Sequence, residues 1–245
     1  MKLEERANAG LHPHVLEKIQ SIQAARDSRI VDLGCGSGAM LNRLAELGYT
    51  NLCGLDIAPP PTPSPSISFI ECDLDACVTP LADESVDLVV SVEVFEHIEN
   101  LGSLLTELHR VLAPRAAMLL TTPNVHSLEA RLRYLLLGKL KQFDALGDPT
   151  HILPIFLFPF ERVLRRHGFE IESSWGYPLD GSSPTSRFGL QAAARVLRAL
   201  GVQGSPSGDQ LCLLVRKGSD LHPSKARSKR ESVTSHYQRQ SPASF

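Results

Sequence analysis

Apolar residues along the chain follow two periods, one typical of buried strands and one typical of amphipathic helices. Short β-branched runs recur, and the run VDLVVSV at 86–92 is almost continuous, as expected for a central parallel strand buried on both faces. Between most of these runs, apolar residues recur every three or four positions, which indicates helices packed on a sheet. The pattern predicts strands at 29–33, 51–55, 67–71, 86–92, 116–121, 169–174 and 210–216.

The helical period predicts an α/β fold in which helices separate most of the strands. One link departs from it: PPPTPSP at 59–65 is a stiff, polyproline-like segment, so we expect one face of the sheet to be thinly covered there. The predicted helices span 11–25, 38–48, 101–112, 128–137, 160–167 and 187–200.

The most informative segment is RIVDLGCGSG at 29–38. A predicted strand ends near Asp32, and Gly34, Gly36 and Gly38 follow at alternate positions before a helix. Glycines in such a turn let the backbone approach a ligand closely. Asp56 ends the next strand, where a carboxylate can accept hydrogen bonds from both hydroxyls of a ribose. These residues predict a site for a nucleoside-containing cofactor.

Two cofactor classes use this layout. Gly34, Gly36 and Ala39 also fit the dinucleotide fingerprint, so an NAD(P)-dependent oxidoreductase is one interpretation. However, the carboxylate of Asp32 would repel a nearby pyrophosphate and would attract a cationic amino group. The glycine loop is also followed by no second nucleotide-binding half. The second interpretation, a cofactor with an ammonium group, is therefore favoured.

The motifs VDLGCGSG at 31–38, GLDI at 54–57 and CDLD at 72–75 resemble those of class I S-adenosylmethionine-dependent methyltransferases. The resemblance runs from about residue 30 to 217 and is strongest to the ubiquinone-biosynthesis O-methyltransferases. It implies a Rossmann-like fold with a seven-stranded, mostly parallel sheet whose last strand is antiparallel. Helices would cover both faces, and an insertion would follow strand five.

The resemblance also implies a role for each cofactor contact. An acid at the end of strand three would accept from the adenine amino group, although the alternative for that residue is a turn at the surface. The implied contacts are Asp32 to the ammonium group, Gly34, Gly36 and Gly38 along the methionine portion, Asp56 to the ribose, Ile57 and the Leu74 N–H to adenine, and Asp73 to its amino group.

A second motif, SVEVFEH at 91–97, follows the central strand. Glu93, Glu96 and His97 are residue types that a divalent metal accepts. The same ExxEH string occurs in the ubiquinone-biosynthesis enzymes and in small-RNA 3′-end 2′-O-methyltransferases. That resemblance suggests metal ligation, with His151 as a downstream ligand. In other relatives the motif belongs to the cofactor loop, and we favour that interpretation, with Glu93 contacting the cofactor, over a metal.

No general base can be assigned from the sequence. His97, His126 and His151 are candidates, since an imidazole titrates near neutral pH. For His126 and His151, which flank the predicted insertion, an exposed loop position is an equally good interpretation.

The insertion at 126–160 is the expected cover of the acceptor site. It contains a Leu-rich helix, Lys139 and Lys141, and the aromatic run HILPIFLFPF at 151–160. These features suit an apolar lid or an interfacial element, with ordinary core packing as the alternative. A lid favours a small-molecule acceptor with an apolar part, methylated on an oxygen of a phenolic, sugar or lipid-linked group. Peripheral membrane contact is compatible with this interpretation.

Charge is distributed unevenly along the chain. From Arg216 to the end there are seven Lys/Arg and two Asp/Glu, which leaves a net charge of −7 on residues 1–215. An acidic body disfavours nucleic acid as a partner. RNA or protein methylation, or a non-catalytic binding module, remain alternatives.

The ends of the chain complete the expected organisation. We expect an N-terminal helical segment at 1–28, a methyltransferase domain at 29–217 and a disordered basic tail at 218–245, which is nearly free of apolar residues. The start MKLEERANAG lacks the apolar region of a signal peptide, and no apolar run reaches the length of a membrane span. A cytoplasmic location is expected.

Overall fold

Seven strands form one sheet in the order β3-β2-β1-β4-β5-β7-β6. The computed structural model describes residues 7–61, 64–76, 78–145, 147–184, 186, 188–202 and 206–218. Strand β7 is antiparallel to both of its neighbours, and the other pairs are parallel. This is the expected Rossmann-like arrangement. The strands are β1 (Arg29–Leu33), β2 (Asn51–Asp56), β3 (Ser68–Glu71), β4 (Val86–Val92), β5 (Leu112–Pro123), β6 (Phe169–Tyr177) and β7 (Gln210–Lys217).

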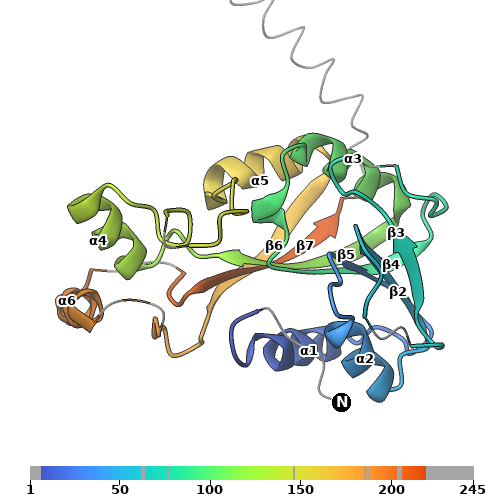
Figure 1. Ribbon diagram of the computed structural model, residues 1–245, viewed down its shortest axis with the longest axis horizontal. Coiled ribbons are helices and arrows are strands. Elements are labelled where there is room, and N and C mark those ends of the chain that lie inside the picture. The colour runs from blue at the N-terminus through green and yellow to red at the C-terminus, as the bar shows by residue number, and fades with distance from the viewer. Residues whose placement is uncertain are drawn as a thin grey trace, which may run out of the picture.

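Helices cover both faces of this sheet. Helices α1 and α2 lie against one face, α3 and α5 lie against the other, and α4 and α6 lie beyond the end of the sheet (Figure 1). Their bounds are α1 (Leu11–Ser21), α2 (Ala39–Glu46), the 3-10 turn η1 (Phe95–His97), α3 (Leu101–Val111), α4 (Leu128–Leu137), α5 (Leu157–Arg166) and α6 (Phe188–Ala199). None of the helices in the described part of the chain is long and apolar enough to cross a membrane.

The core is divided by the sheet into two apolar clusters, because successive side chains of a strand point to opposite faces. In β1, Val31 and Leu33 pack with α3 and α5, whereas Ile30 packs with α1 and α2. The central strand β4 has buried side chains on both faces, as its continuous apolar run predicts. Edge strand β3 has no fully buried residue, which confirms the thin cover expected after the proline-rich link.

Several element boundaries differ from those predicted. Helix α5 begins at Leu157 rather than at 160, because Pro159 falls in its first turn, where a backbone N–H is not needed. Helix α3 ends at Val111 and β5 starts immediately at Leu112, four residues earlier than expected. Strand β6 continues to Tyr177. The predicted basic tail, apart from Gly218, lies outside the described residues.

Aromatic contacts fix the N-terminal helix α1 to the end of edge strand β6. The Trp175 indole N–H donates to Nε2 of His14 at 2.8 Å, and the His14 ring stacks on Tyr177 with centroids 4.9 Å apart. These contacts place the start of α1 and the residues before it at the rim of the cleft described below.

Candidate functional site

A cleft of about 830 Å³ opens at the carboxyl ends of β1, β2 and β4. This is where ligands bind in open α/β sheets. The structure brings most of the residues predicted from the sequence to this one cleft. Those that line it are Asp32, Gly34, Gly36, Asp56, Ile57, Asp73, Leu74, Glu93, His97 and His151.

The turn between β1 and α2 requires glycine at three positions. Gly34, Gly36 and Gly38 have φ angles of 62°, 51° and 76°, which L side chains rarely adopt. Gly34 is constrained a second time, since a Cβ atom there would lie 2.7 Å from Cγ2 of Val94. The backbone of Gly34 and Gly36 therefore lines the cleft with no side chain in the way.

Replacing Gly34 with alanine is expected to lower the free energy of unfolding by about 2 kcal/mol, from left-handed strain and the clash with Val94. Gly138→Ala is a matched control, because Gly138 has a φ of 63° and open space around its Cβ position. We expect the control to lose only about 1 kcal/mol. Urea unfolding measures both values, and Val94→Ala should recover part of the Gly34→Ala loss. Equal losses at the two glycines would show that Val94 does not constrain the turn.

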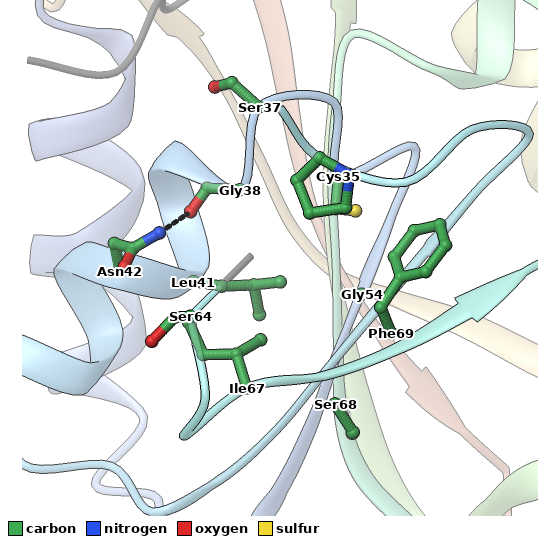
Figure 2. A pocket seen from close by; sticks show the side chains of 11 residues that line it. Cys35, Ser37, Gly38, Leu41, Asn42, Gly54, Ser64, Ile67, Ser68 and Phe69 are labelled. Atoms are coloured by element: carbon green, nitrogen blue, oxygen red, sulfur yellow. Dashed lines mark hydrogen bonds between the residues drawn. The ribbon is translucent and has the colours of Figure 1, made fainter. Parts of the chain in front are cut away.

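Gly38 lies apart from the main cleft and lines a small second pocket beneath the turn (Figure 2). The pocket has a volume of about 20 Å³, and Cys35, Leu41 and Phe69 contribute to its largely apolar wall. The side-chain amide of Asn42 donates to the Gly38 carbonyl at 2.8 Å and holds the start of α2. A space of this size has room for about one water, so we interpret it as a packing gap behind the turn.

Two carboxylates lie at the floor of the cleft. The pKa of Asp32 is raised to about 8, first by burial and then by the charge of Asp56. The Asp56 side chain accepts a hydrogen bond at 2.7 Å from the N–H of Gly36, so the second strand and the glycine turn are joined directly. A cationic ligand group beside Asp32 would favour its ionised form and reverse the effect of burial.

The loop after β3 forms the next part of the wall. Asp73 lies in a turn, where its Oδ1 accepts from the N–H of Asp75 at 2.9 Å, and the neighbouring Leu74 is buried. Ile57, across the cleft entrance, is 70% exposed. An exposed apolar side chain at the rim offers a surface on which a flat ring can pack.

Glu93 adopts an unusual backbone conformation directly after β4. Its φ is 56°, and its N–H donates to both the carbonyl and the Oγ1 of Thr121 at 3.1 Å. The Thr121 hydroxyl donates back to the carboxylate at 3.1 Å. Burial, more than any neighbouring group, raises the pKa of Glu93 to about 7. The side chain lines the cleft.

Glu96, His97 and His151 form a separate cluster, whose ligand atoms all lie within 4.8 Å of one another. Glu93, which the sequence motif grouped with them, is not a member. Glu96 is fully buried, and both of its carboxylate oxygens lack a hydrogen-bond partner among the described residues. Burial and the charge of Glu93 raise its pKa well above the usual value.

The two histidine rings of this cluster are held through Nδ1. Nδ1 of His97 lies 3.0 Å from the Thr150 carbonyl, and Nδ1 of His151 lies 3.0 Å from the Gln142 carbonyl. A carbonyl accepts only from a protonated ring nitrogen, so in the neutral form of each ring Nε2 keeps its lone pair. This is how metal-ligating histidines are usually oriented. The carboxylate and two imidazoles therefore fit a divalent cation.

His126 does not line the cleft. Its Nε2 accepts a hydrogen bond from the N–H of Leu157 at 2.9 Å, and so satisfies one of the free donors at the start of α5. Burial lowers the pKa of its ring. His126 is thus placed as a structural residue, which leaves His97 and His151 as the two candidate histidines from the sequence that line the cleft.

The aromatic run of the insertion is also placed differently from the expected lid. Phe160 is buried in the core edge-to-face with Phe95, while Phe156 and Phe158 are exposed away from the cleft. The part of the insertion that does line the cleft is polar: Gln142, Asp148, Thr150 and His151. The aromatic run therefore does not form an apolar lid over the cleft: Phe160 follows the alternative of core packing, and Phe156 and Phe158 face elsewhere.

Some cleft residues were not singled out in the sequence. Ala7, Asn8 and His12 reach the cleft because α1 folds back against β6, and no local motif signals this. Thr150 could have been noticed, because Asp148-Pro149-Thr150 is a turn sequence. Its N–H and hydroxyl both donate to the Asp148 carboxylate, which sets the carbonyl that holds His97.

Comparison with known proteins identifies relatives of this fold. Residues 6–174 match a family model described as a methyltransferase domain. A probable S-adenosylmethionine-dependent methyltransferase of Mycolicibacterium smegmatis is 26% identical over 67% of this chain and 60% of its own length. The mitochondrial ubiquinone biosynthesis O-methyltransferase of Rattus norvegicus is 27% identical over 70% of this chain and 54% of its own length. The chain thus spans little more than half of these relatives.

Solved structures support the fold. A SAM-dependent methyltransferase from Archaeoglobus fulgidus is 18% identical with a TM-score of 0.58, covering 84% of this chain and 93% of its own. The 1,6-didemethyltoxoflavin-N1-methyltransferase of Burkholderia thailandensis, with bound S-adenosylhomocysteine, is 15% identical with a TM-score of 0.56, covering 86% and 79%.

Proposed function

Because the chain belongs to the methyltransferase domain family, we propose that its cleft binds S-adenosylmethionine and transfers the methyl group to an oxygen of a small molecule. The observation that carries this proposal is the meeting of the glycine turn with Asp32 and Asp56 at one cleft. A phenolic, sugar or lipid-linked acceptor suits it, and the similarity to ubiquinone biosynthesis O-methyltransferases supports oxygen as the acceptor atom.

In this proposal each end of the cofactor meets a distinct set of residues. Asp32 receives the ammonium group, and Asp56 accepts from the ribose hydroxyls while the N–H of Gly36 holds it in place. Gly34 and Gly36 line the methionine portion, with Gly38 supporting the turn from behind.

The adenine ring is assigned to the loops after β2 and β3. It packs on Ile57 and beside Leu74, and its amino group donates to Asp73. Glu93, which lines the same cleft, is assigned to the boundary between the cofactor and the acceptor.

For this reaction the protein needs mainly to align the acceptor with the methyl group and to exclude water from the site. The acceptor oxygen attacks the methyl carbon in line with its bond to sulfur, so a C–O bond forms as the C–S bond breaks and the positive charge on sulfur disappears. Holding the reactants in this geometry lowers the barrier by about 7–11 kcal/mol in favourable cases. The acceptor's proton passes to water or to Glu93, which lines the same cleft, since His97 and His151 are assigned to the cation proposed next.

A divalent cation held by Glu96, His97 and His151 is the second part of the proposal. The two oxygens of Glu96 support it: neither accepts a hydrogen bond among the described residues, Nε2 of His151 lies 4.0 Å from Oε1, and a buried carboxylate without hydrogen bonds is costly. Because of these oxygens we propose a cation for Glu96, His97 and His151, instead of the cofactor-loop role that we favoured for the motif from the sequence. When bound, such a cation would lower the pKa of a coordinated acceptor hydroxyl.

Chelator treatment is therefore expected to lower both activity and melting temperature, and a divalent metal should restore both. The melting temperature gives a readout that needs no substrate, because a cation bound only by the folded state stabilises it. In Glu96→Gln the response to metal should disappear. Glu161→Gln is a control, since Glu161 lies on α5 in an exposed pair with Arg165. Activity and melting temperature that ignore both chelator and metal would refute the cation.

Calorimetric titration with S-adenosylhomocysteine tests the cofactor, and a screen of phenolic, sugar and lipid-linked acceptors for methyl transfer then tests the reaction. Micromolar binding of S-adenosylhomocysteine is expected. Binding of NAD in its place would overturn the proposal.

A further inference from the structure

Helices α4 and α6 form a pair that lies beyond the end of the sheet, side by side (Figure 1). The guanidinium of Arg198 on α6 donates to both carboxylate oxygens of Glu129 on α4 at 2.9 Å, which joins the two helices. Neither helix contributes a residue to the two core clusters of the sheet. The pair is therefore an appendage that packs mainly on itself.

The last turn of α4 is apolar on every side. Tyr134, Leu135, Leu136 and Leu137 are 57%, 78%, 66% and 51% exposed. Consecutive residues of a helix lie about 100° apart, so four of them cover the whole circumference. Further apolar side chains are exposed on α6, namely Phe188 and Val196, and directly after it at Leu200. Exposed apolar side chains in this number, on two helices that contact each other, mark an interaction surface. We call this surface the α4–α6 tip.

The exposed charges around the tip have one sign. Arg131, Lys139 and Arg195 are exposed. The acids of this region are paired with arginines: Glu129, which is buried, with Arg198, and Asp144, which is partly buried, with Arg133. Within the described parts of 127–145 and 188–202, no acidic side chain is exposed. An apolar end ringed by cations is the chemistry of a segment that binds an anionic membrane surface.

We propose that the α4–α6 tip docks on an anionic lipid bilayer. Its apolar side chains enter the boundary between headgroups and acyl chains, while Arg131, Lys139 and Arg195 face the lipid phosphates. A second copy of the chain fits less well, since a symmetric contact would bring the same cations together. The segment 219–245 fits less well too, because it carries five Lys/Arg and two Asp/Glu.

Docking at the tip would place the membrane next to the acceptor end of the cleft. The chain leaves α4 at Gly138 and within a few residues reaches Gln142, which lines the cleft. The wall continues with Asp148, Thr150 and His151. An acceptor with an apolar tail could then enter from the bilayer; this consequence rests on the proposed function, whereas the docking itself does not.

Flotation of the full-length protein with vesicles tests the docking. We expect binding to phosphatidylcholine vesicles that contain phosphatidylglycerol to be at least tenfold stronger than to phosphatidylcholine alone. Leu135→Ser with Leu136→Ser should weaken this binding at least tenfold, and Lys139→Glu with Arg195→Glu should do the same. All four side chains are exposed, so the fold should be retained.

Val78→Ser is the matched control, because Val78 is 82% exposed and outside the tip, and it should bind as the wild type does. S-adenosylhomocysteine affinity, measured for each variant, should stay within twofold. If the wild type binds S-adenosylhomocysteine but not vesicles, the docking alone is refuted. If it binds vesicles but not S-adenosylhomocysteine, the proposed function alone is refuted.

Two other outcomes would also overturn the docking. One is a wild type that self-associates in sedimentation velocity and becomes monomeric in the Leu135→Ser, Leu136→Ser variant, which would make the tip an interface between copies. The other is vesicle binding that survives the tip variants but is lost on Lys229→Glu with Arg230→Glu, which would assign the binding to the C-terminal segment.

Discussion

Replacing Lys141 with methionine is expected to lower the free energy of unfolding by about 3–5 kcal/mol, because it removes one partner of a buried ion pair. Lys141 is 6% exposed and Asp209 is 1% exposed, and the ammonium group contacts both that carboxylate and the Ser183 hydroxyl. Burial lowers the pKa of Lys141, and the charge of Asp209 opposes this effect. Methionine keeps the length of the stem but leaves the buried carboxylate without its cation. Urea unfolding measures the loss.

Two variants show whether the loss comes from the buried charge. Arg216→Met breaks the exposed pair between Arg216 and Glu172 and should cost less than about 1 kcal/mol. Adding Asp209→Asn to Lys141→Met should recover part of the stability, because no unpaired charge then remains. A double variant that is as unstable as the two single losses combined would mean that the residues stabilise the fold independently.

Asp56→Ala is expected to weaken S-adenosylhomocysteine binding about a hundredfold, the equivalent of about 2.8 kcal/mol. Two effects would combine: in the proposed complex the ribose hydroxyls lose their acceptor, and the Gly36 N–H loses the carboxylate that holds the glycine turn. Calorimetry measures the affinity, and the melting temperature without ligand separates weaker binding from a loss of fold.

Asp87→Ala is the matched control for Asp56. Asp87 also accepts a backbone N–H, that of Arg29 at 2.8 Å, but at the opposite end of β1. It should leave the affinity unchanged within about threefold. An affinity at Asp56→Ala equal to that of the control would remove Asp56 from the cofactor site.

That the glycine turn, Asp32 and Asp56 meet at one cleft could be predicted from the sequence, because the signals are local. The three glycines must adopt a positive φ within one turn, and Asp32 and Asp56 end two strands that pair side by side. Parallel neighbours bring their carboxyl ends to the same edge, so the order of elements alone places these acids together. Only Gly38 lies differently, on the back of the turn.

The cluster of Glu96, His97 and His151 could not be predicted in the same way. ExxEH places Glu93 and Glu96 three residues apart, yet the backbone at Glu93 has a positive φ and the 3-10 turn begins two residues later, so their side chains take different positions. Glu96 is joined instead by His151, which lies 55 positions away and is held by the carbonyl of Gln142. No periodicity carries that information.

Two lysines, two residues apart, show most plainly what the sequence determines and what only the tertiary structure decides. By itself the sequence determined the α/β layering, the glycine turn and its acids, since these depend on apolar period, on glycine's freedom and on parallel pairing. It could not distinguish Lys139 from Lys141. One is exposed beyond α4, and the other is buried against Asp209, 68 positions along the chain. Only the packing of segments distant in the sequence decides whether such a charged side chain is exposed to water or buried in an ion pair.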